Sequence, residues 1–309
     1  MWCPLGKCSV VGGAASRRGG YVPSVQRVLR NLAFSVLLAG VVLGLLESGL
    51  RLFGIPDPGL YAGDVGSLWT LRAEMPSRQV PFRERGTSFA VRTNRLGFRG
   101  EEPASGGIVC LGDSTTFGWG VEEEEAWPAR LAALLGEATV NGGVPGYSTV
   151  QGLATLDTAL SLRPRLVVVA YLVRDAELGQ GPDRLRVAGV APPSLALFRL
   201  IRELRGARPA PPGTTFRVPP EEYAANVREL ARRIREAGSE VQVLAFPMRT
   251  PPVAHLTALQ ALRTDVPILA PSLPDESFFV EDPIHLTPAG NAALAEQVAA
   301  ALSLRPPTP

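Results

Sequence analysis

A serine in the first half of the chain and an acid–histidine pair near its end are the residues best suited to carry chemistry. Ser114 lies in the segment IVCLGDSTTFGWG, directly after a short apolar run, and Asp282 and His285 lie together in EDPIHLTPAGN. A serine hydroxyl is a weak nucleophile until an imidazole takes its proton, and a carboxylate that fixes the imidazole tautomer assists this step. The three residues therefore predict catalysis by a serine nucleophile.

The choice of base and of oxyanion donor follows from the same segments. The chain has two histidines, and the other one, His255, has no comparable acid near it in the sequence. Acyl transfer also needs donors aimed at the developing oxyanion. The segment NGGVPGYS offers the N–H of Gly146, although it also suits a plain Gly/Pro turn. Asp113, beside the serine, is expected to brace the turn rather than to act as the acid of the triad.

From Gly107 onward, apolar runs typical of buried strands alternate with helical patterns. Strands are expected over residues 108–111, 139–141, 166–171, 241–246 and 266–269, and helices over 127–135, over a stretch ending before Gly238, and after the capping pair Thr287 and Pro288. This alternation predicts a three-layer α/β/α sandwich with a mostly parallel five-stranded sheet. Ligands bind at the carboxyl ends of such strands, where Ser114 would lie.

An uncharged run, LAFSVLLAGVVLGLL, precedes this domain and predicts one transmembrane helix over residues 31–53. Five Lys and Arg residues precede the run, whereas only Arg51 closely follows it. The positive-inside rule then places residues 1–30 in the cytoplasm and the domain outside, in the periplasm or beyond, on a single-pass protein of the inner (cytoplasmic) membrane. A cleaved signal peptide is one alternative, but no small-x-small cleavage site follows Leu46. A buried helix of a soluble protein is the other, but apolar residues occupy every face of the expected helix rather than one stripe.

The remaining segments carry less information. Residues 1–25 are expected to be disordered, and residues 54–105 to form a small β extension without visible catalytic residues. The main domain would then occupy residues 106–304. Residues 176–220 form an expected insertion with a short helix near 195–204, which would be either a lid or a surface loop. The acidic run 122–125 is expected to be a solvated approach to the next helix.

The composition argues against several other functions. The net charge of +2 and the lack of a basic stripe argue against a nucleic-acid partner. Cys3, Cys8 and Cys110 do not form a disulfide framework, and Cys110 is expected to lie in the core. No local spacing of His, Cys and acidic residues suits a metal, so neither a metal nor a cofactor is expected.

Together these segments resemble the GDSL/SGNH hydrolase family, whose name records a Ser, a Gly, an Asn and a His in separate sequence blocks. GDST resembles the nucleophile block and marks Ser114, NGGVPG resembles the second block and marks Gly146, and DPIH resembles the last block and marks Asp282 and His285. The resemblance implies a flavodoxin-like fold, esterase activity, and an oxyanion hole that includes the N–H groups of Ser114 and Gly146. The N-terminal anchor followed by VRTNRLGFRGEE is similar to membrane-tethered bacterial members.

One block departs from the family pattern. After the third strand the family usually has Asn-Asp, with the Asn side chain as a third oxyanion donor, whereas this chain has YLVRDAE, with Arg174 in the Asn position. Removing one such donor costs roughly 10²–10³ in turnover. Arg174 could replace the Asn as a hydrogen-bond donor to the oxyanion, or it could bind an anionic substrate. It could also pair with a neighbouring acid such as Asp175, which would leave the enzyme weakened.

The sequence thus leads to one main hypothesis and two alternatives. The main hypothesis is a membrane-anchored serine esterase that removes an acyl group from an envelope or extracellular carbohydrate or lipid. An O-acyltransferase of the envelope with the same nucleophile is the first alternative. A binding module of the same fold, catalytically weakened because of Arg174, is the second.

Overall fold

The computed structural model describes residues 24–53, 60–64, 67–82, 87–179, 181–187, 195–205 and 213–304. The expected disordered tail falls almost entirely outside these ranges, together with Cys3 and Cys8. The chain divides into two compact units, Met1–Ile55 and Pro56–Pro309.

The first unit contains one long apolar helix, α1 (Val25–Leu52). It begins before the expected start at residue 31, and its 28 residues at about 1.5 Å each exceed the roughly 30 Å of a bilayer core. Among the described residues it is the one helix long and apolar enough to cross a membrane. A signal sequence near an N-terminus meets the same criteria of length and apolar composition, so the retained anchor stays a prediction.

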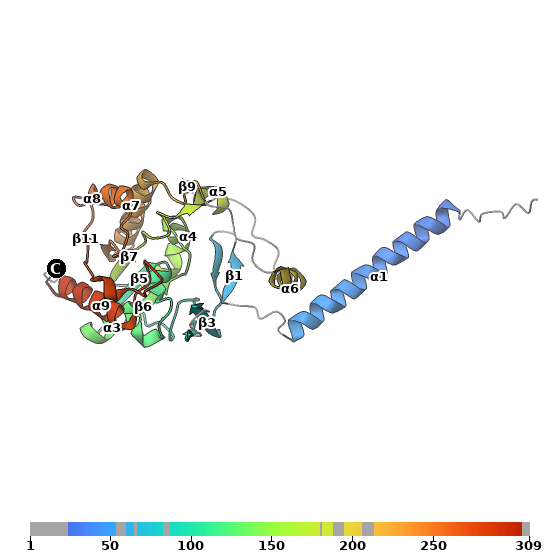
Figure 1. The fold of residues 1–309 in the computed structure, drawn as a ribbon, viewed down its shortest axis with the longest axis horizontal. Coiled ribbons are helices and arrows are strands. Elements are labelled where there is room, and N and C mark those ends of the chain that lie inside the picture. Colours follow the sequence, from blue (N-terminus) through green and yellow to red (C-terminus); the bar gives the residue numbers. More distant parts are fainter. Residues whose placement is uncertain are drawn as a thin grey trace, which may run out of the picture. The chain divides into compact units, whose positions relative to one another are not determined.

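The second unit is built around a five-stranded sheet in the order β11–β10–β7–β5–β6 (Figure 1). Its strands are β5 (Ile108–Gly112), β6 (Thr139–Gly143), β7 (Leu166–Ala170), β10 (Glu240–Leu244) and β11 (Ile268–Leu269). Every neighbouring pair in this sheet is parallel. The structure confirms the predicted parallel five-stranded sheet, with each strand boundary within two residues of its expected position.

Helices cover both faces of this sheet, which confirms the predicted three layers. One face packs against α3 (Trp127–Leu135) and α9 (Pro288–Ser303). The other packs against α4 (Thr149–Leu160), α7 (Pro220–Glu236) and α8 (Val253–Gln260). Successive side chains of a strand point to opposite faces, so every residue of β5 and β7 is buried, including Cys110 as expected.

The expected β extension consists of two antiparallel hairpins. One pairs β1 (Tyr61–Asp64) with β2 (Leu68–Leu71), and the other pairs β3 (Pro76–Phe82) with β4 (Thr87–Arg92). The apolar side chains of Leu71 and Phe89 belong to the same hydrophobic cluster as those of α4 and α7. The extension therefore shares a core with the main domain.

The insertion also contains regular structure. A short antiparallel pair, β8 (Leu178–Gly179) with β9 (Thr215–Phe216), accompanies α5 (Asp183–Val187) and α6 (Ala196–Arg205). The short helix expected near 195–204 is α6. Residues 188–194 and 206–212 lie outside the described ranges, so the choice between a lid and a surface loop stays open.

A close approach between β6 and the four-residue helix α2 (Ser114–Phe117) requires glycine at position 143. A Cβ atom there would lie 2.3 Å from the backbone nitrogen of Phe117, so α2 would have to move. We expect Gly143→Ala to lower the free energy of unfolding by about 1–3 kcal/mol, as overpacking typically does.

Urea unfolding of the purified protein measures this effect. Gly63→Ala is the matched control, because no atom lies within 4 Å of its added Cβ. Equal stabilities of the two variants would contradict the prediction.

Candidate active site

Ser114 lies where the chain leaves the central strand β5 and enters α2. It is 2% exposed and is the first residue of the helix, so its N–H has no partner within the helix. The Asp113 side chain accepts hydrogen bonds from the N–H and the hydroxyl of Thr115, both at 2.8 Å, which confirms that Asp113 braces the turn. Because β5 is flanked by β6 and β7, Ser114 occupies the position where ligands bind in open α/β sheets.

The structure brings the three residues Ser114, His285 and Asp282 into one hydrogen-bonded line. The Ser114 Oγ lies 2.8 Å from His285 Nε2, and His285 Nδ1 lies 2.5 Å from Asp282 Oδ2. With a proton on Nδ1, the ring donates to Asp282 and leaves Nε2 free to accept from the serine hydroxyl. This arrangement can take a proton from Ser114, although the catalytic roles themselves stay a prediction.

The loop that carries His285 is held by the start of α9. Thr287 caps this helix by accepting a hydrogen bond from the N–H of Gly290, as expected from the Thr-Pro pair. Asn291 donates to the carbonyls of Leu286 and Thr287 and accepts from the N–H of Trp127 at the start of α3. The loop is therefore fixed against the helix that packs on the same face of the sheet.

Asp282 is kept ionised by its contacts. Burial alone would raise its pKa, but the hydrogen bond and charge of His285, together with the N–H groups of Ile284 and His285, lower the pKa to about 2. Those two N–H groups donate to Asp282 Oδ1 at 2.9 and 3.0 Å. The carboxylate is thus available to stabilise a protonated imidazole.

Gly146 occupies the turn that follows β6, beside the serine turn. Its φ of +87° lies in the left-handed region that favours glycine, and the ring of Trp69 would lie 2.9 Å from an added Cβ. The N–H of Val144 donates to the carbonyl of Gly112 at the end of β5, which ties this turn to the strand before Ser114. Within the described part of the chain, no group accepts from the N–H of Gly146.

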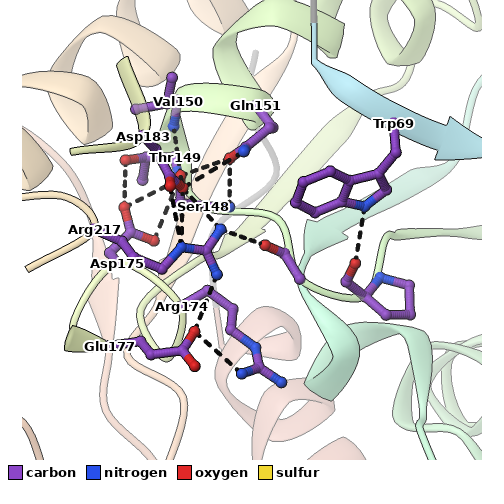
Figure 2. A network of polar contacts seen from close by, with 12 residues as sticks. Trp69, Ser148, Thr149, Val150, Gln151, Arg174, Asp175, Glu177, Asp183 and Arg217 are labelled. Carbon is purple, nitrogen blue, oxygen red and sulfur yellow. Dashed lines mark hydrogen bonds and ion pairs between the residues drawn. The ribbon is translucent and has the colours of Figure 1, made fainter. Parts of the chain in front are cut away.

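Arg174 lies just beyond β7, and Figure 2 shows its polar neighbours. Its Nη1 lies 3.2 Å from a carboxylate oxygen of Glu177, so its acidic partner is Glu177 rather than the suggested Asp175. Its Nε is buried and has no partner among the described residues.

Asp175 has a different partner, Thr149 at the start of α4. It accepts hydrogen bonds from the N–H of Thr149 at 3.0 Å and from the Thr149 hydroxyl at 2.5 Å. Burial raises its pKa to about 7, although the bonds from Thr149 act in the opposite direction. Asp175 therefore anchors the start of α4.

Arg99 supports the turn that carries Ser114, a role that the sequence did not predict. It is 3% exposed, and its Nη1 donates to the carbonyls of Phe117 and Gly118 at 2.6 and 2.8 Å, at the end of α2. Its Nη2 donates to the carbonyl of Val121. Burial lowers its pKa to about 10, so it remains charged at neutral pH. A lone arginine in LGFRG has no periodicity that would indicate this role.

Two other sequence expectations concern charged or titratable groups. His255 is buried, its Nε2 lies 2.8 Å from the carbonyl of Val218, and burial lowers its pKa, so it packs α8 against the domain. The acidic run forms a 3₁₀ helix, η2 (Glu123–Glu125), but it is not merely solvated, because the side chain of Glu122 accepts a hydrogen bond from the N–H of Ala90 in β4.

No group of three or more His, Cys, Asp and Glu that could hold a metal occurs among the described residues.

Comparison with known proteins places this site in a family. The family model of the GDSL-like Lipase/Acylhydrolase family matches residues 110–293. Two similar solved structures are a GDSL-like lipase from Bacteroides thetaiotaomicron (13% identity, 63% of this chain and 87% of that chain, TM-score 0.43) and a mutant acetyl-xylooligosaccharide esterase from Geobacillus stearmophilus (14% identity, 66% and 96%, TM-score 0.43). The comparison with curated proteins gave no match.

The lowered pKa of Asp282 leads to a prediction about stability in acid. Because this pKa is lower in the folded protein than its ordinary value of 3.8, the unfolded chain binds more protons between about pH 4 and 2. The contribution of Asp282 is present above pH 4 and is lost as the pH falls towards 2. We expect the difference in unfolding free energy between the parent and Asp282→Asn to shrink by about 2 kcal/mol from pH 5 to pH 2.

Urea unfolding at several pH values tests this expectation. Asp275→Asn is the control, because Asp275 is exposed in the same region and, within the part of the chain that the structure describes, its carboxylate forms an ion pair with Arg249 alone. A difference between the parent and Asp282→Asn that does not change with pH would contradict the argument.

Proposed function

Because the chain belongs to the GDSL-like Lipase/Acylhydrolase family, we propose that it is a membrane-anchored serine esterase that works through an acyl-enzyme on Ser114. The family makes the chain an esterase or acylhydrolase. The observation that carries the finer proposal is the 2.8 Å contact between Ser114 Oγ and His285 Nε2, with Asp282 behind the imidazole. Nothing in this arrangement requires a cofactor.

The acylation step uses these groups in order. His285 Nε2 takes the proton of Ser114 as Oγ attacks the ester carbonyl carbon, and Asp282 stabilises the resulting imidazolium. The N–H groups of Ser114 and Gly146 donate to the carbonyl oxygen as it becomes negative. The tetrahedral intermediate then expels the alkoxide, which takes the proton from His285 and leaves as the alcohol.

Deacylation repeats the sequence with water. His285 takes a proton from the water molecule, whose oxygen attacks the acyl carbon on Ser114. Collapse of the second tetrahedral intermediate releases the carboxylic acid, and the proton on His285 returns to Ser114 Oγ. An acceptor hydroxyl in place of water would make the same enzyme an acyltransferase.

Arg174 is proposed as the third oxyanion donor, in the position where the family usually has Asn. It follows β7, and Ala170 at the end of β7 is paired with Gly112 at the end of β5, so both segments leave the same edge of the sheet. No described residue contacts its Nε as a hydrogen-bond partner, and an arginine can donate charged hydrogen bonds from several nitrogens. A cation there would favour the negative transition state more than a neutral amide would.

The proposed location follows from the helix and the charges around it. The apolar helix has 28 residues, and five Lys and Arg residues precede its uncharged run whereas only Arg51 closely follows it. This asymmetry supports an anchor whose catalytic domain lies outside the cytoplasmic membrane. Esters of envelope or extracellular carbohydrates and lipids are the substrates within reach of such a domain.

Covalent labelling tests the nucleophile. A fluorophosphonate probe applied to the detergent-solubilised full chain is expected to label the parent and not Ser114→Ala, because the probe reacts only with an activated serine. Labelling of neither protein would favour the binding module of the same fold. Equal labelling of both would assign the reaction to another residue.

Product analysis separates hydrolysis from acyl transfer. The full chain is incubated with p-nitrophenyl acetate, with and without an oligosaccharide acceptor. We expect p-nitrophenol and free acetate to be released at similar rates with and without the oligosaccharide. Nitrophenol release that requires the oligosaccharide, with acetate found on the sugar, would make the protein an acyltransferase.

Substitution of Arg174 distinguishes its possible roles. If Arg174 donates to the oxyanion, Arg174→Ala lowers kcat on the neutral ester by roughly 10²–10³. Arg174→Asn, which restores the residue usual in the family, should retain more activity than Arg174→Ala. A rise of KM confined to esters with an anionic group would instead assign Arg174 to substrate binding, and no change in either constant would exclude both roles.

A further inference from the structure

Two side chains from outside the strand–helix pattern bind the turn that carries Gly146 (Figure 2). Trp69, in β2 of the extension, donates from its ring N–H to the carbonyl of Pro145 at 3.2 Å. Arg217, directly after β9 in the insertion, donates from Nη2 to the carbonyl of Gly146 at 2.7 Å. These two carbonyls belong to the peptide units on either side of the Gly146 Cα.

The planarity of the peptide bond turns these contacts into constraints on one N–H group. The carbonyl of Pro145 and the N–H of Gly146 share a planar unit and point in opposite directions, so fixing the carbonyl fixes the direction of the N–H. The Gly146 carbonyl belongs to the next unit, and Arg217 fixes that one. The turn itself is closed by the N–H of Tyr147, which donates to the carbonyl of Val144 at 3.1 Å. Trp69 and Arg217 add one hydrogen bond to each peptide unit that flanks the Cα of Gly146, the residue with the fewest backbone restrictions.

Arg217 is itself held rigidly. Its guanidinium contacts Asp183 through Nε and through Nη2, the latter at 2.8 Å, and its Nη1 lies 3.0 Å from Glu177. The Arg217 side chain is 8% exposed and that of Asp183 is fully buried, so neither charge can leave its partner without a large desolvation penalty.

The same ion pair also holds the other end of the turn. Asp183 Oδ2 accepts a hydrogen bond of 2.9 Å from the hydroxyl of Ser148, which caps α4. Arg217 therefore binds Gly146 directly, and it is linked to Ser148 through Asp183. Glu177 extends the contact to Arg174, since it accepts from both arginines.

We propose that Trp69 and Arg217 are positioning residues that aim the N–H of Gly146 at the oxyanion of the reaction. This role rests on the proposed function, because it needs Gly146 to be an oxyanion donor. It gives the extension and the insertion a part in the reaction, although neither carries the nucleophile, the base or the acid. A donor displaced by about 1 Å can cost roughly 10²-fold in rate.

Two conservative variants test the proposal in the full chain. Trp69→Phe keeps an aromatic ring against Gly146 but removes its N–H, and Arg217→Lys keeps the charge beside Asp183 but removes the guanidinium fork. We expect each variant to lower kcat per titrated active site by roughly 10- to 100-fold, with KM for p-nitrophenyl acetate unchanged within about twofold. The inhibition constant of phenylboronic acid, whose serine adduct is tetrahedral, should rise by a similar factor.

Arg233→Lys is the matched control. Arg233 makes the same kinds of contact, to the carbonyl of Leu153 and the carboxylate of Asp157, but it joins α7 to α4 away from the Gly146 turn. We expect this variant to match the parent in kcat and in inhibition by the boronic acid. If Arg217→Lys does not fold, the charge-neutral double variant Arg217→Gln with Asp183→Asn replaces it, because it leaves no unpaired buried charge.

Hydrogen exchange of backbone N–H groups tests whether Trp69 and Arg217 fix the turn without relying on catalytic activity. The backbone N–H groups of residues 143, 144 and 146–148 should exchange faster in Trp69→Phe and Arg217→Lys than in the parent and in Arg233→Lys. Unchanged exchange in both variants overturns the inference, and so do unchanged kcat and boronic acid inhibition in an active parent. A parent that neither hydrolyses esters nor reacts with fluorophosphonate refutes the proposed function instead, while the exchange data still decide whether these side chains fix the turn.

Discussion

The hydrogen bond between Ser114 Oγ and His285 Nε2 is the contact on which the candidate site depends, because it joins residues 171 positions apart in the chain. A parallel sheet makes this contact possible. Ser114 leaves the carboxyl end of the central strand β5, and α9 packs beside α3 on one face of the sheet, so the loop before α9 reaches the same edge. The serine turn and the histidine loop are each also held by their own hydrogen bonds, from Thr115 to Asp113 in the first and from Asn291 to Leu286 in the second.

The backbone turns around this contact are held by side chains from outside the regular strand–helix pattern. Arg99 from the segment after the hairpins donates to the carbonyls at the end of α2, and Arg217 from the insertion donates to the carbonyl of Gly146. A guanidinium suits both places because its several N–H groups form a fixed planar fork that can serve more than one acceptor at once. The extension and the insertion are thus structural parts of the site.

The charges at this edge of the sheet are arranged along the path of the proposed reaction. Asp282 places a negative charge behind the imidazole, where it favours the positive ring that forms when the serine loses its proton. Arg174 places a cation on the segment that follows the neighbouring strand, in the position of the amide that the family usually has. Glu177 and Asp183 together balance Arg174 and Arg217, so the cation is retained without leaving a large net charge in a partly buried region.

The sequence alone determined the fold class and the strand–helix order, because these depend on local patterns of apolar runs and caps. It also marked Ser114, Asp282 and His285 as candidates, because a serine after a strand and an acid three residues before a histidine are local signals, whereas the contact between Ser114 and His285 is a tertiary one. The resemblance to the family also marked Arg174 as a departure, because it stands after the third strand where the family usually has Asn. Only the tertiary structure assigned Glu177, rather than Asp175, as the partner of Arg174 and revealed Arg99, Trp69 and Arg217 as residues that hold the turns. These contacts join segments up to 76 residues apart through single side chains and backbone carbonyls, and carbonyls are present at every residue, so no pattern of residue types along the chain can indicate them.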